Sequence, residues 1–226
     1  MKKINITVNG PIGAGKTTFI ERLEEALRKK SEAVIVQPEP SVTIPFINDV
    51  LKNFYSDNSG WSYPLQVLIS GAQEAYLQQL RETDYDYAIM DAAWSSYIYG
   101  YSHYKHGRMS LRDYNALASL SRPFRFDYLI WIGGDKEEIV SHIRGRNAQV
   151  ANGELGEAKK DVEIEDFSYI DSHLKDFSEY LPVYLSKFKS FNPDINIIML
   201  DHIPDINSDA YQEMIDSIVD KIAGSV

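Results

Sequence analysis

The residues from Gly10 to Thr17 have the types and spacing needed to bind phosphate. They fit the pattern G-x-x-x-x-G-K-[ST] and follow the apolar run Ile4–Val8. Small residues let successive backbone N–H groups close around phosphate oxygens, and Lys16 adds a positive charge near the outer phosphates. The Thr17 hydroxyl can ligate Mg²⁺, and a helix expected from about Lys16 to Lys29 directs its positive dipole end at the same anion. The segment predicts a nucleoside triphosphate co-substrate. The residues expected to contact it here are Gly10, Ile12, Gly13, Ala14, Gly15, Lys16, Thr17 and Thr18.

Two carboxylates lie where predicted strands end, which is where phosphoryl transfer needs a metal ligand and a proton acceptor. Glu39 stands between Pro38 and Pro40, which keep it out of a helix and let its side chain project from the strand end. Asp91 ends a short apolar run and is a candidate Mg²⁺ ligand. A solvated turn acid is the alternative for Glu39, and a helix N-cap is the second role open to Asp91.

The segment Phe54–Gln66 is rich in aromatic residues. Aromatic faces beside an amide are how proteins sandwich and hydrogen-bond a nucleobase, so this segment suggests an acceptor that carries a base. Trp61 and Tyr63, taken alone, are equally typical of a core. Gln66 is more informative, because an amide directed into an apolar pocket must find a partner.

The elements that must position these residues alternate along the chain. Short apolar runs at Ile4–Val8, Ala33–Val36, Tyr87–Met90, Tyr128–Ile132 and Ile195–Leu200 are separated by segments with helical spacing. This alternation predicts a three-layer α/β/α fold around a five-stranded parallel sheet. Helices are also expected at 164–186 and 206–224, with a loop at Asn147–Asp161. Because parallel strands present functional groups at their carboxyl ends, the groups that follow the first three strands should converge on one edge.

Composition narrows the classes of function. The chain has 226 residues, 44% hydrophobic content, a formal net charge of −10 and no cysteine. One domain over residues 1–226 is expected, and the negative charge disfavours a nucleic-acid partner. No apolar run approaches the roughly 20 residues of a membrane span, and the chain enters a strand directly after Met1-Lys-Lys, so we expect no membrane partner and a cytoplasmic location.

Together these motifs resemble the deoxynucleoside kinase family over roughly residues 4 to 185. The resemblance is carried by the phosphate loop, Pro38-Glu39-Pro40, the series Tyr55…Trp61-Ser…Gln66 and Arg144-Gly-Arg146-Asn. It implies the fold above, ATP as donor with Mg²⁺, a deoxynucleoside as acceptor and a homodimer. It further implies that Glu39 accepts the proton of the nucleoside 5′-hydroxyl and that Gln66 pairs with the base edge.

The remaining implied roles concern the sugar, the lid and the base. Trp61 would lie near the 5′ region, and Tyr55 with Asp171 would hold the 3′-hydroxyl, although family members usually carry Glu at the latter position. Arg144 and Arg146 would belong to a lid, at about residues 144–161, that closes over the triphosphate.

This sequence departs from the family pattern at the third strand end, where Asp91-Ala92-Ala93 replaces Glu/Asp-Arg-Ser. The arginine beside the reacting oxygen is therefore absent, and Arg108, Arg122 and Arg125 are candidates to replace its charge. Val140 stands where a further lid arginine is common. The Arg and Asp pair that often reads the base corresponds to Gln73 and Tyr97, the candidates here for base contacts.

Three hypotheses follow: an ATP-dependent deoxynucleoside 5′-kinase, a nucleoside monophosphate kinase of the thymidylate kinase kind, and a catalytically weakened nucleotide-binding regulator. A monophosphate acceptor needs cations, yet Lys52 and Arg81 are the only Lys or Arg residues between Gln37 and Lys105, which favours a neutral nucleoside. The stretch Tyr97–Tyr101 is expected to pack against the pocket or a second subunit, and His103 and His106 to form a polar helix end.

Overall fold

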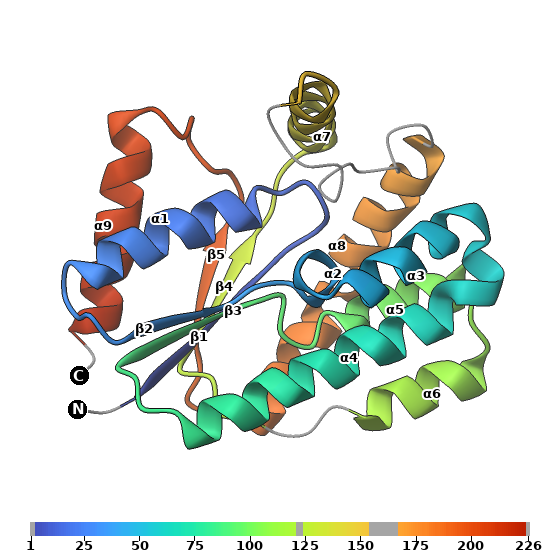
Figure 1. Ribbon diagram of the computed structural model, residues 1–226, viewed down its shortest axis with the longest axis horizontal. Helices are drawn as coiled ribbons and strands as arrows, with labels where there is room; N and C mark the ends of the chain where they lie inside the picture. Colours follow the sequence, from blue (N-terminus) through green and yellow to red (C-terminus); the bar gives the residue numbers. More distant parts are fainter. Residues whose placement is uncertain (1–2, 121–123, 154–166, 225–226) are drawn as a thin grey trace.

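The computed structural model describes residues 3–120, 124–153 and 167–224 (Figure 1). The strands are β1 (Ile4–Asn9), β2 (Val34–Gln37), β3 (Tyr87–Asp91), β4 (Tyr128–Ile132) and β5 (Asn196–Leu200). The helices are α1 (Lys16–Arg28), α2 (Pro40–Thr43), α3 (Pro45–Ser56), α4 (Asn58–Glu82), α5 (Ser96–Lys105), α6 (Leu111–Leu120), α7 (Lys136–Ala151), α8 (Phe167–Phe191) and α9 (Asp209–Ala223).

The strands form one parallel sheet in the order β2-β3-β1-β4-β5. Each of the five predicted strands is present within one residue of its expected start, and the α/β fold with a five-stranded parallel sheet is confirmed. β3 and β4 are buried along their whole length, because helices cover both faces of the sheet. The order places β2, β3 and β1 side by side, so the residues after Gln37, Asp91 and Asn9 meet at one edge.

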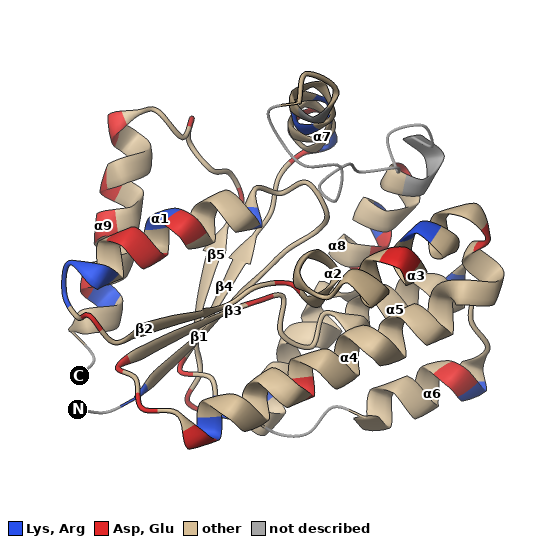
Figure 2. Cartoon of the chain, viewed as in Figure 1, with Lys and Arg blue, Asp and Glu red and all other residues tan. Residues whose placement is uncertain are grey.

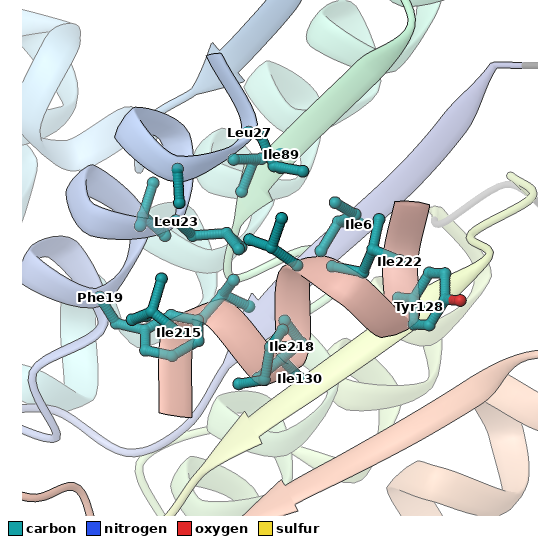
Figure 3. Close-up of a cluster of buried hydrophobic side chains, with 14 of the residues drawn as sticks. Ile6, Phe19, Leu23, Leu27, Ile89, Tyr128, Ile130, Ile215, Ile218 and Ile222 are labelled. Atoms are coloured by element: carbon teal, nitrogen blue, oxygen red, sulfur yellow. The ribbon is translucent and has the colours of Figure 1, made fainter. Parts of the chain in front are cut away.

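Two apolar layers hold the sheet between helices. On one face, α1 and α9 pack Phe19, Leu23 and Ile215 against strand residues such as Ile6 and Ile130 (Figure 3). On the other face, α4, α5 and α8 pack an aromatic-rich cluster against β3 and β4. A third apolar cluster joins α3, α4 and α7 beyond the carboxyl edge of the sheet. The covering helices therefore leave that edge as the place where loops can form a site.

Several helix boundaries differ from the sequence prediction. The loop expected at Asn147–Asp161 is wrong at its start, because α7 continues to Ala151, and residues 154–161 lie outside the described ranges, as does part of the predicted lid. The helix expected over 164–186 is described from Phe167 and extends to Phe191. The last helix begins at Asp209, where the Ser208 side chain caps it.

The aromatic segment Phe54–Gln66 is divided between two helices. Asp57 separates α3 from α4, and its carboxylate accepts a hydrogen bond from the Gly60 backbone N at 3.0 Å. In the described part of the chain, no helix has the length and apolar character that crossing a membrane requires.

Candidate active site

The loop between β1 and α1 is shaped to hold an anion. Gly10 passes so close to β4 that a Cβ atom would lie 2.2 Å from the Ile132 carbonyl oxygen, so a larger residue does not fit there. Gly15 precedes α1 with a left-handed φ of 81°, and no side chain caps the first amides of this helix. These N–H groups are therefore open to phosphate oxygens.

Lys16 lies along this loop. Its Nζ donates hydrogen bonds to the carbonyl oxygens of Pro11 at 2.8 Å and Gly10 at 3.2 Å. The ammonium group is thus held beside the loop amides, and the phosphates of a bound nucleotide would offer it stronger, charged acceptors.

Glu39 and Asp91 lie at the ends of the neighbouring strands β2 and β3. The Glu39 Oε1 accepts a hydrogen bond from the Ser41 hydroxyl at 2.9 Å. Asp91 is 5% exposed, and its Oδ1 has no hydrogen-bond partner among the described residues. Burial, followed by the negative charge of Glu39, raises the pKa of Asp91 to about 7, while Lys16 acts in the opposite direction. The two carboxylates and Lys16 therefore interact electrostatically at one point of the sheet edge.

This carboxylate pair fits a divalent cation. The unpartnered Oδ1 of Asp91 is a buried acceptor, and the exposed Thr17 lies in the first turn of α1, which follows the adjacent strand. Carboxylate and hydroxyl oxygens are ligands that Mg²⁺ accepts, and a cation would remove the cost of burying the Asp91 charge.

A cavity of about 1130 Å³ opens beside the phosphate loop and extends between α3, α4 and α5. Of the residues predicted from the sequence, those that line it are Ile12, Gly13, Ala14, Gly15, Lys16, Thr17, Thr18, Glu39, Tyr55, Gln66, Asp91 and Arg146. Its volume lies just above the range of about 300–1,000 Å³ that is usual for ligand pockets, so it can hold more than one small molecule. Lys and Arg residues at the start of α1 and along α7 flank its phosphate-loop end (Figure 2).

The far end of the cavity is apolar with isolated polar groups. Phe54, Leu65 and Ile69 line it together with Tyr55 and Gln66. Gln66 is 3% exposed, and its Oε1 has no hydrogen-bond partner in the described part of the chain. Since buried amides are normally paired, the unmet oxygen points to a ligand that donates to it.

Gln73 and Tyr97, the residues expected to contact the base, have side chains that form hydrogen bonds within the fold. The Gln73 Nε2 donates to the Ala92 carbonyl at 2.7 Å, and its Oε1 accepts from the Trp94 backbone N at 3.2 Å. The Tyr97 hydroxyl donates to the Ala118 carbonyl at 2.7 Å. Neither residue is among those lining the cavity. Gln73 therefore holds the turn after β3, and Tyr97 joins α5 to α6.

Trp61, Asp171, Arg144 and Gly10 are also absent from the cavity lining. Trp61 packs half-buried against the apolar cluster of α3, α4 and α7. Asp171 forms an ion pair with Lys136 at 2.7 Å, which ties α8 to the start of α7, so the structure does not place it at a sugar site. Arg144 is exposed on α7, whereas Arg146 lines the cavity.

Of the three arginines expected to replace the charge missing at Ala92, the two that the structure describes, Arg108 and Arg125, are not among the residues that line the cavity. Arg125 pairs with Asp127 at 3.8 Å beside the amino end of β4, the opposite edge of the sheet. Arg108 lines a separate groove with Tyr63 and Met109, and Arg122 lies outside the described residues. Within the described cavity lining, the Lys and Arg residues are Lys16, Lys52 and Arg146.

Sequence reasoning missed several residues of the cavity. His103 was expected at a polar helix end, but it is 1% exposed and lines the cavity with Tyr99. Tyr101, expected near the pocket or a second subunit, stacks on Tyr180 of α8 with ring centroids 4.1 Å apart. The loop Ile203–Asn207 between β5 and α9 also lines the cavity, and its place after a parallel strand was the signal that could have identified it.

Comparisons with known proteins bear on the family and the fold of this chain. The family model described as deoxynucleoside kinase matches residues 6–222. A structure of deoxyadenosine kinase from M. mycoides, with products dCMP and a flexible dCDP bound, matches with a TM-score of 0.65 and 18% identity over 99% of this chain and 100% of that one. The same enzyme with bound dATP matches with a TM-score of 0.66 and 17% identity over 95% and 99%. No curated protein sequence matches. At such identities the structural likeness shows the fold.

Proposed function

This chain belongs to the deoxynucleoside kinase family, and we propose that it transfers the γ-phosphoryl group of ATP, with Mg²⁺, to the 5′-hydroxyl of a deoxynucleoside. The family match supports deoxynucleoside phosphorylation by a nucleotide donor. The observation that carries the residue assignment is the cavity, in which the phosphate loop, the Glu39 and Asp91 carboxylates and the unpartnered Gln66 amide share one space.

On the donor side, the loop amides and the Lys16 ammonium bind the phosphates. Arg146 reaches the same end of the cavity from α7, and its positive charge stabilises the charge that develops on the transferred group. The Asp91 carboxylate and the Thr17 hydroxyl hold the magnesium ion. When bound, this ion neutralises phosphate charge and so favours transfer.

On the acceptor side, Glu39 acts as the general base. Its carboxylate accepts the proton of the 5′-hydroxyl as that oxygen forms a bond to the γ-phosphorus, and the bond from phosphorus to the bridging oxygen of ADP breaks. Ser41 holds one Glu39 oxygen through the 2.9 Å hydrogen bond, which leaves the other oxygen for the substrate. Proton acceptor and phosphate site thus face the same cavity.

The nucleoside lies in the apolar end of the cavity. Gln66 pairs with the base edge, because its buried Oε1 needs a donor, and Phe54 offers an aromatic face beside it. Tyr55, which lines the cavity and packs edge-on against Phe54 with ring centroids 5.2 Å apart, binds the sugar.

The charge distribution disfavours a monophosphate acceptor. Lys52 is the one Lys or Arg that α3 and α4 contribute to the described cavity lining, and it already pairs with Asp49 at 3.4 Å. Arg81 lies at the far end of α4, within 3.9 Å of Glu74. A dianionic acceptor would therefore lack the arginine clamp that such substrates require.

The direct test measures phosphate transfer from ATP·Mg²⁺ to each of the four deoxynucleosides and, in parallel, to their 5′-monophosphates, with products identified by mass. We expect turnover on at least one nucleoside and none on the monophosphates. Turnover on monophosphates alone would refute the acceptor assignment. Binding of ATP without turnover on any acceptor would instead identify a regulatory protein.

The assembly and location are proposed on the family resemblance alone. We propose a homodimer in the cytoplasm, where ATP and salvaged nucleosides are available. Light scattering coupled to size-exclusion chromatography tests the first statement, since a dimer has twice the 25.8 kDa mass of the chain. Cell fractionation tests the second.

A further inference from the structure

The apolar end of the cavity contains a second buried polar side chain besides Gln66. His103 projects from α5, lines the cavity and is 1% exposed. Its Nδ1 has no hydrogen-bond partner among the described residues. Gln66, on the neighbouring helix α4, also lines the cavity and has a buried oxygen without a partner within the described ranges, so two adjacent helices each contribute to the cavity lining one side chain with an unpartnered polar atom.

The His103 ring is neutral at physiological pH. Burial is the main cause that lowers its pKa, to about 3, and the charges of Arg108 and His106 act in the same direction against Asp176. A neutral imidazole has one N–H donor and one acceptor nitrogen. His103 can therefore form a directional hydrogen bond without bringing a charge to an uncharged base.

The position of His103 is fixed by its neighbours. Its ring packs edge-on against Phe54, with centroids 5.1 Å apart. The residue before it, Ser102, donates to the buried Asp176 of α8 at 2.7 Å, which anchors this end of α5. A polar group on a rigid, packed element can discriminate between ligands, because it cannot move to accommodate a wrong one.

We propose that His103 selects the base of the acceptor nucleoside by a hydrogen bond from its imidazole to a polar position on the base that Gln66 holds. This inference rests on the proposed function. Gln73 and Tyr97, the residues expected to complete base recognition, are hydrogen-bonded within the fold. His103 lines the cavity and follows Tyr97 on the same helix by about 1.7 turns. A base without a suitable group there leaves the buried nitrogen unmet and binds more weakly.

The test compares His103→Asn with His103→Leu. The two replacements have nearly the same shape and remove the same ring, but only Asn retains a polar atom near the position of Nδ1. We expect His103→Asn to keep the base preference of the wild-type protein. His103→Leu should lose about tenfold in kcat/KM relative to Asn for the preferred deoxynucleoside and change little for the others, through KM more than kcat.

Equal profiles for the Asn and Leu variants, or a uniform loss on all four nucleosides, would overturn the proposal. The matched control is His173→Asn against His173→Leu. His173 is an equally buried imidazole whose pKa burial also lowers to about 3, but it packs between Tyr99 and Phe177 and is not among the cavity-lining residues. We expect both His173 variants to alter thermal stability without changing the base profile.

If the variants fail to fold, a measurement on the wild-type protein can still test the proposal. Imidazole ¹⁵N NMR should show one neutral histidine whose nitrogen shift moves when the preferred deoxynucleoside is added without ATP. If every histidine shift stays constant during saturation with nucleoside, His103 does not contact the base. Failure of the proposed function is distinguishable, because the wild-type protein would then phosphorylate no nucleoside.

Discussion

Gln73 and Ala92 are joined across the turn that follows β3, where the Gln73 Nε2 donates to the Ala92 carbonyl oxygen at 2.7 Å. The oxygen of the same amide accepts from the Trp94 backbone N at 3.2 Å. Ala92 and Trp94 both have left-handed φ angles, of 56° and 54°, which non-glycine residues adopt at a cost. Gln73 therefore holds a strained turn directly beside Asp91.

Replacement of Gln73 by Met should reduce stability rather than base selection. The Ala92 carbonyl and the Trp94 N–H would lose their partner in a buried environment, so the free energy of unfolding should fall by about 2 kcal/mol. Urea denaturation measures this loss, and a nucleoside titration tests selection. A changed base preference at unchanged stability would contradict the structural role of Gln73.

Gln66→Met is the matched control on the same helix. The Gln66 Oε1 has no partner to lose among the described residues, so the free energy of unfolding should change by less than about 0.5 kcal/mol. Affinity for the nucleoside should fall about tenfold or more, measured by calorimetry without ATP. Comparison of the two variants therefore distinguishes a glutamine that stabilises the fold, Gln73, from one that binds the ligand, Gln66.

Ala92→Gly should stabilise the protein by about 1 kcal/mol. Glycine adopts a φ of 56° without the steric cost that a Cβ imposes, and the small loss of buried methyl surface offsets only part of this gain. Ala93→Gly is the control, because Ala93 is not among the residues with positive φ. We expect that substitution to lower the melting temperature. A lower melting temperature for Ala92→Gly as well would show that the turn is not strained.

Glu39→Gln should lower kcat by about 10³-fold with little change in nucleoside affinity, because the amide keeps the shape of the side chain but cannot accept the proton. Single-turnover kinetics and calorimetry separate the two quantities. Lys16→Ala, in contrast, should weaken ATP binding. Near-normal turnover of Glu39→Gln would show that Glu39 is not the general base, and it would not affect the assignment of the nucleotide site.

Arg146→Ala and Arg144→Ala test which of these two α7 residues acts on the triphosphate. Arg146 lines the cavity, and Arg144 does not. Loss of Arg146 should therefore lower kcat/KM for ATP by tenfold or more, since a cation that stabilises transferred charge contributes several kcal/mol. Loss of Arg144 should cost less than threefold. Equal losses would indicate that α7 rearranges when the nucleotide binds.

Much of the fold could be predicted because buried parallel strands produce continuous apolar runs. Tyr87–Asp91 and Tyr128–Ile132 are buried at every position, and their boundaries are visible in the sequence. The phosphate loop could also be recognised from the sequence, because its glycines are required by the local backbone geometry. Gln66 could be identified because an amide in an apolar context requires a partner.

The residues whose surroundings differ from those expected from the sequence depend on contacts between distant parts of the chain. The Gln73 side chain is hydrogen-bonded to the turn at Ala92. No local sequence pattern reveals that Ala92 has a strained, left-handed backbone conformation. His103 has a polar sequence neighbourhood, but Phe54 and α8 enclose it. Asp171 is expected at the sugar from the family resemblance, yet its side chain is half-exposed and forms an ion pair with Lys136. Sequence spacing places residues on elements, and packing decides which of them reach the cavity.

Asp176 provides a prediction about pH. Burial alone would raise the pKa of this carboxyl, but hydrogen bonds from Lys105, Ser102 and His106, at 2.9, 2.7 and 2.7 Å, outweigh burial and lower it. A lowered folded-state pKa means that the ionised carboxylate stabilises the fold above its unfolded pKa of about 3.9. This stabilisation is lost as the pH falls through the lower folded-state value.

Asp176→Asn should therefore reduce the free energy of unfolding by about 2 kcal/mol at pH 7. The difference from the wild-type protein should begin to shrink below about pH 4, where the carboxyl of the unfolded wild-type chain becomes protonated, and should be smallest below the lowered folded-state pKa, where the carboxyl is neutral in both states. Urea denaturation across this range measures the difference. Glu179→Gln is the control: Glu179 also binds Lys105, at 2.5 Å, but its side chain is 45% exposed, so its loss should cost less than about 0.5 kcal/mol. A deficit in Asp176→Asn that stays constant down to pH 3 would show that packing, and not charge, makes Asp176 important for anchoring α5 beside the cavity.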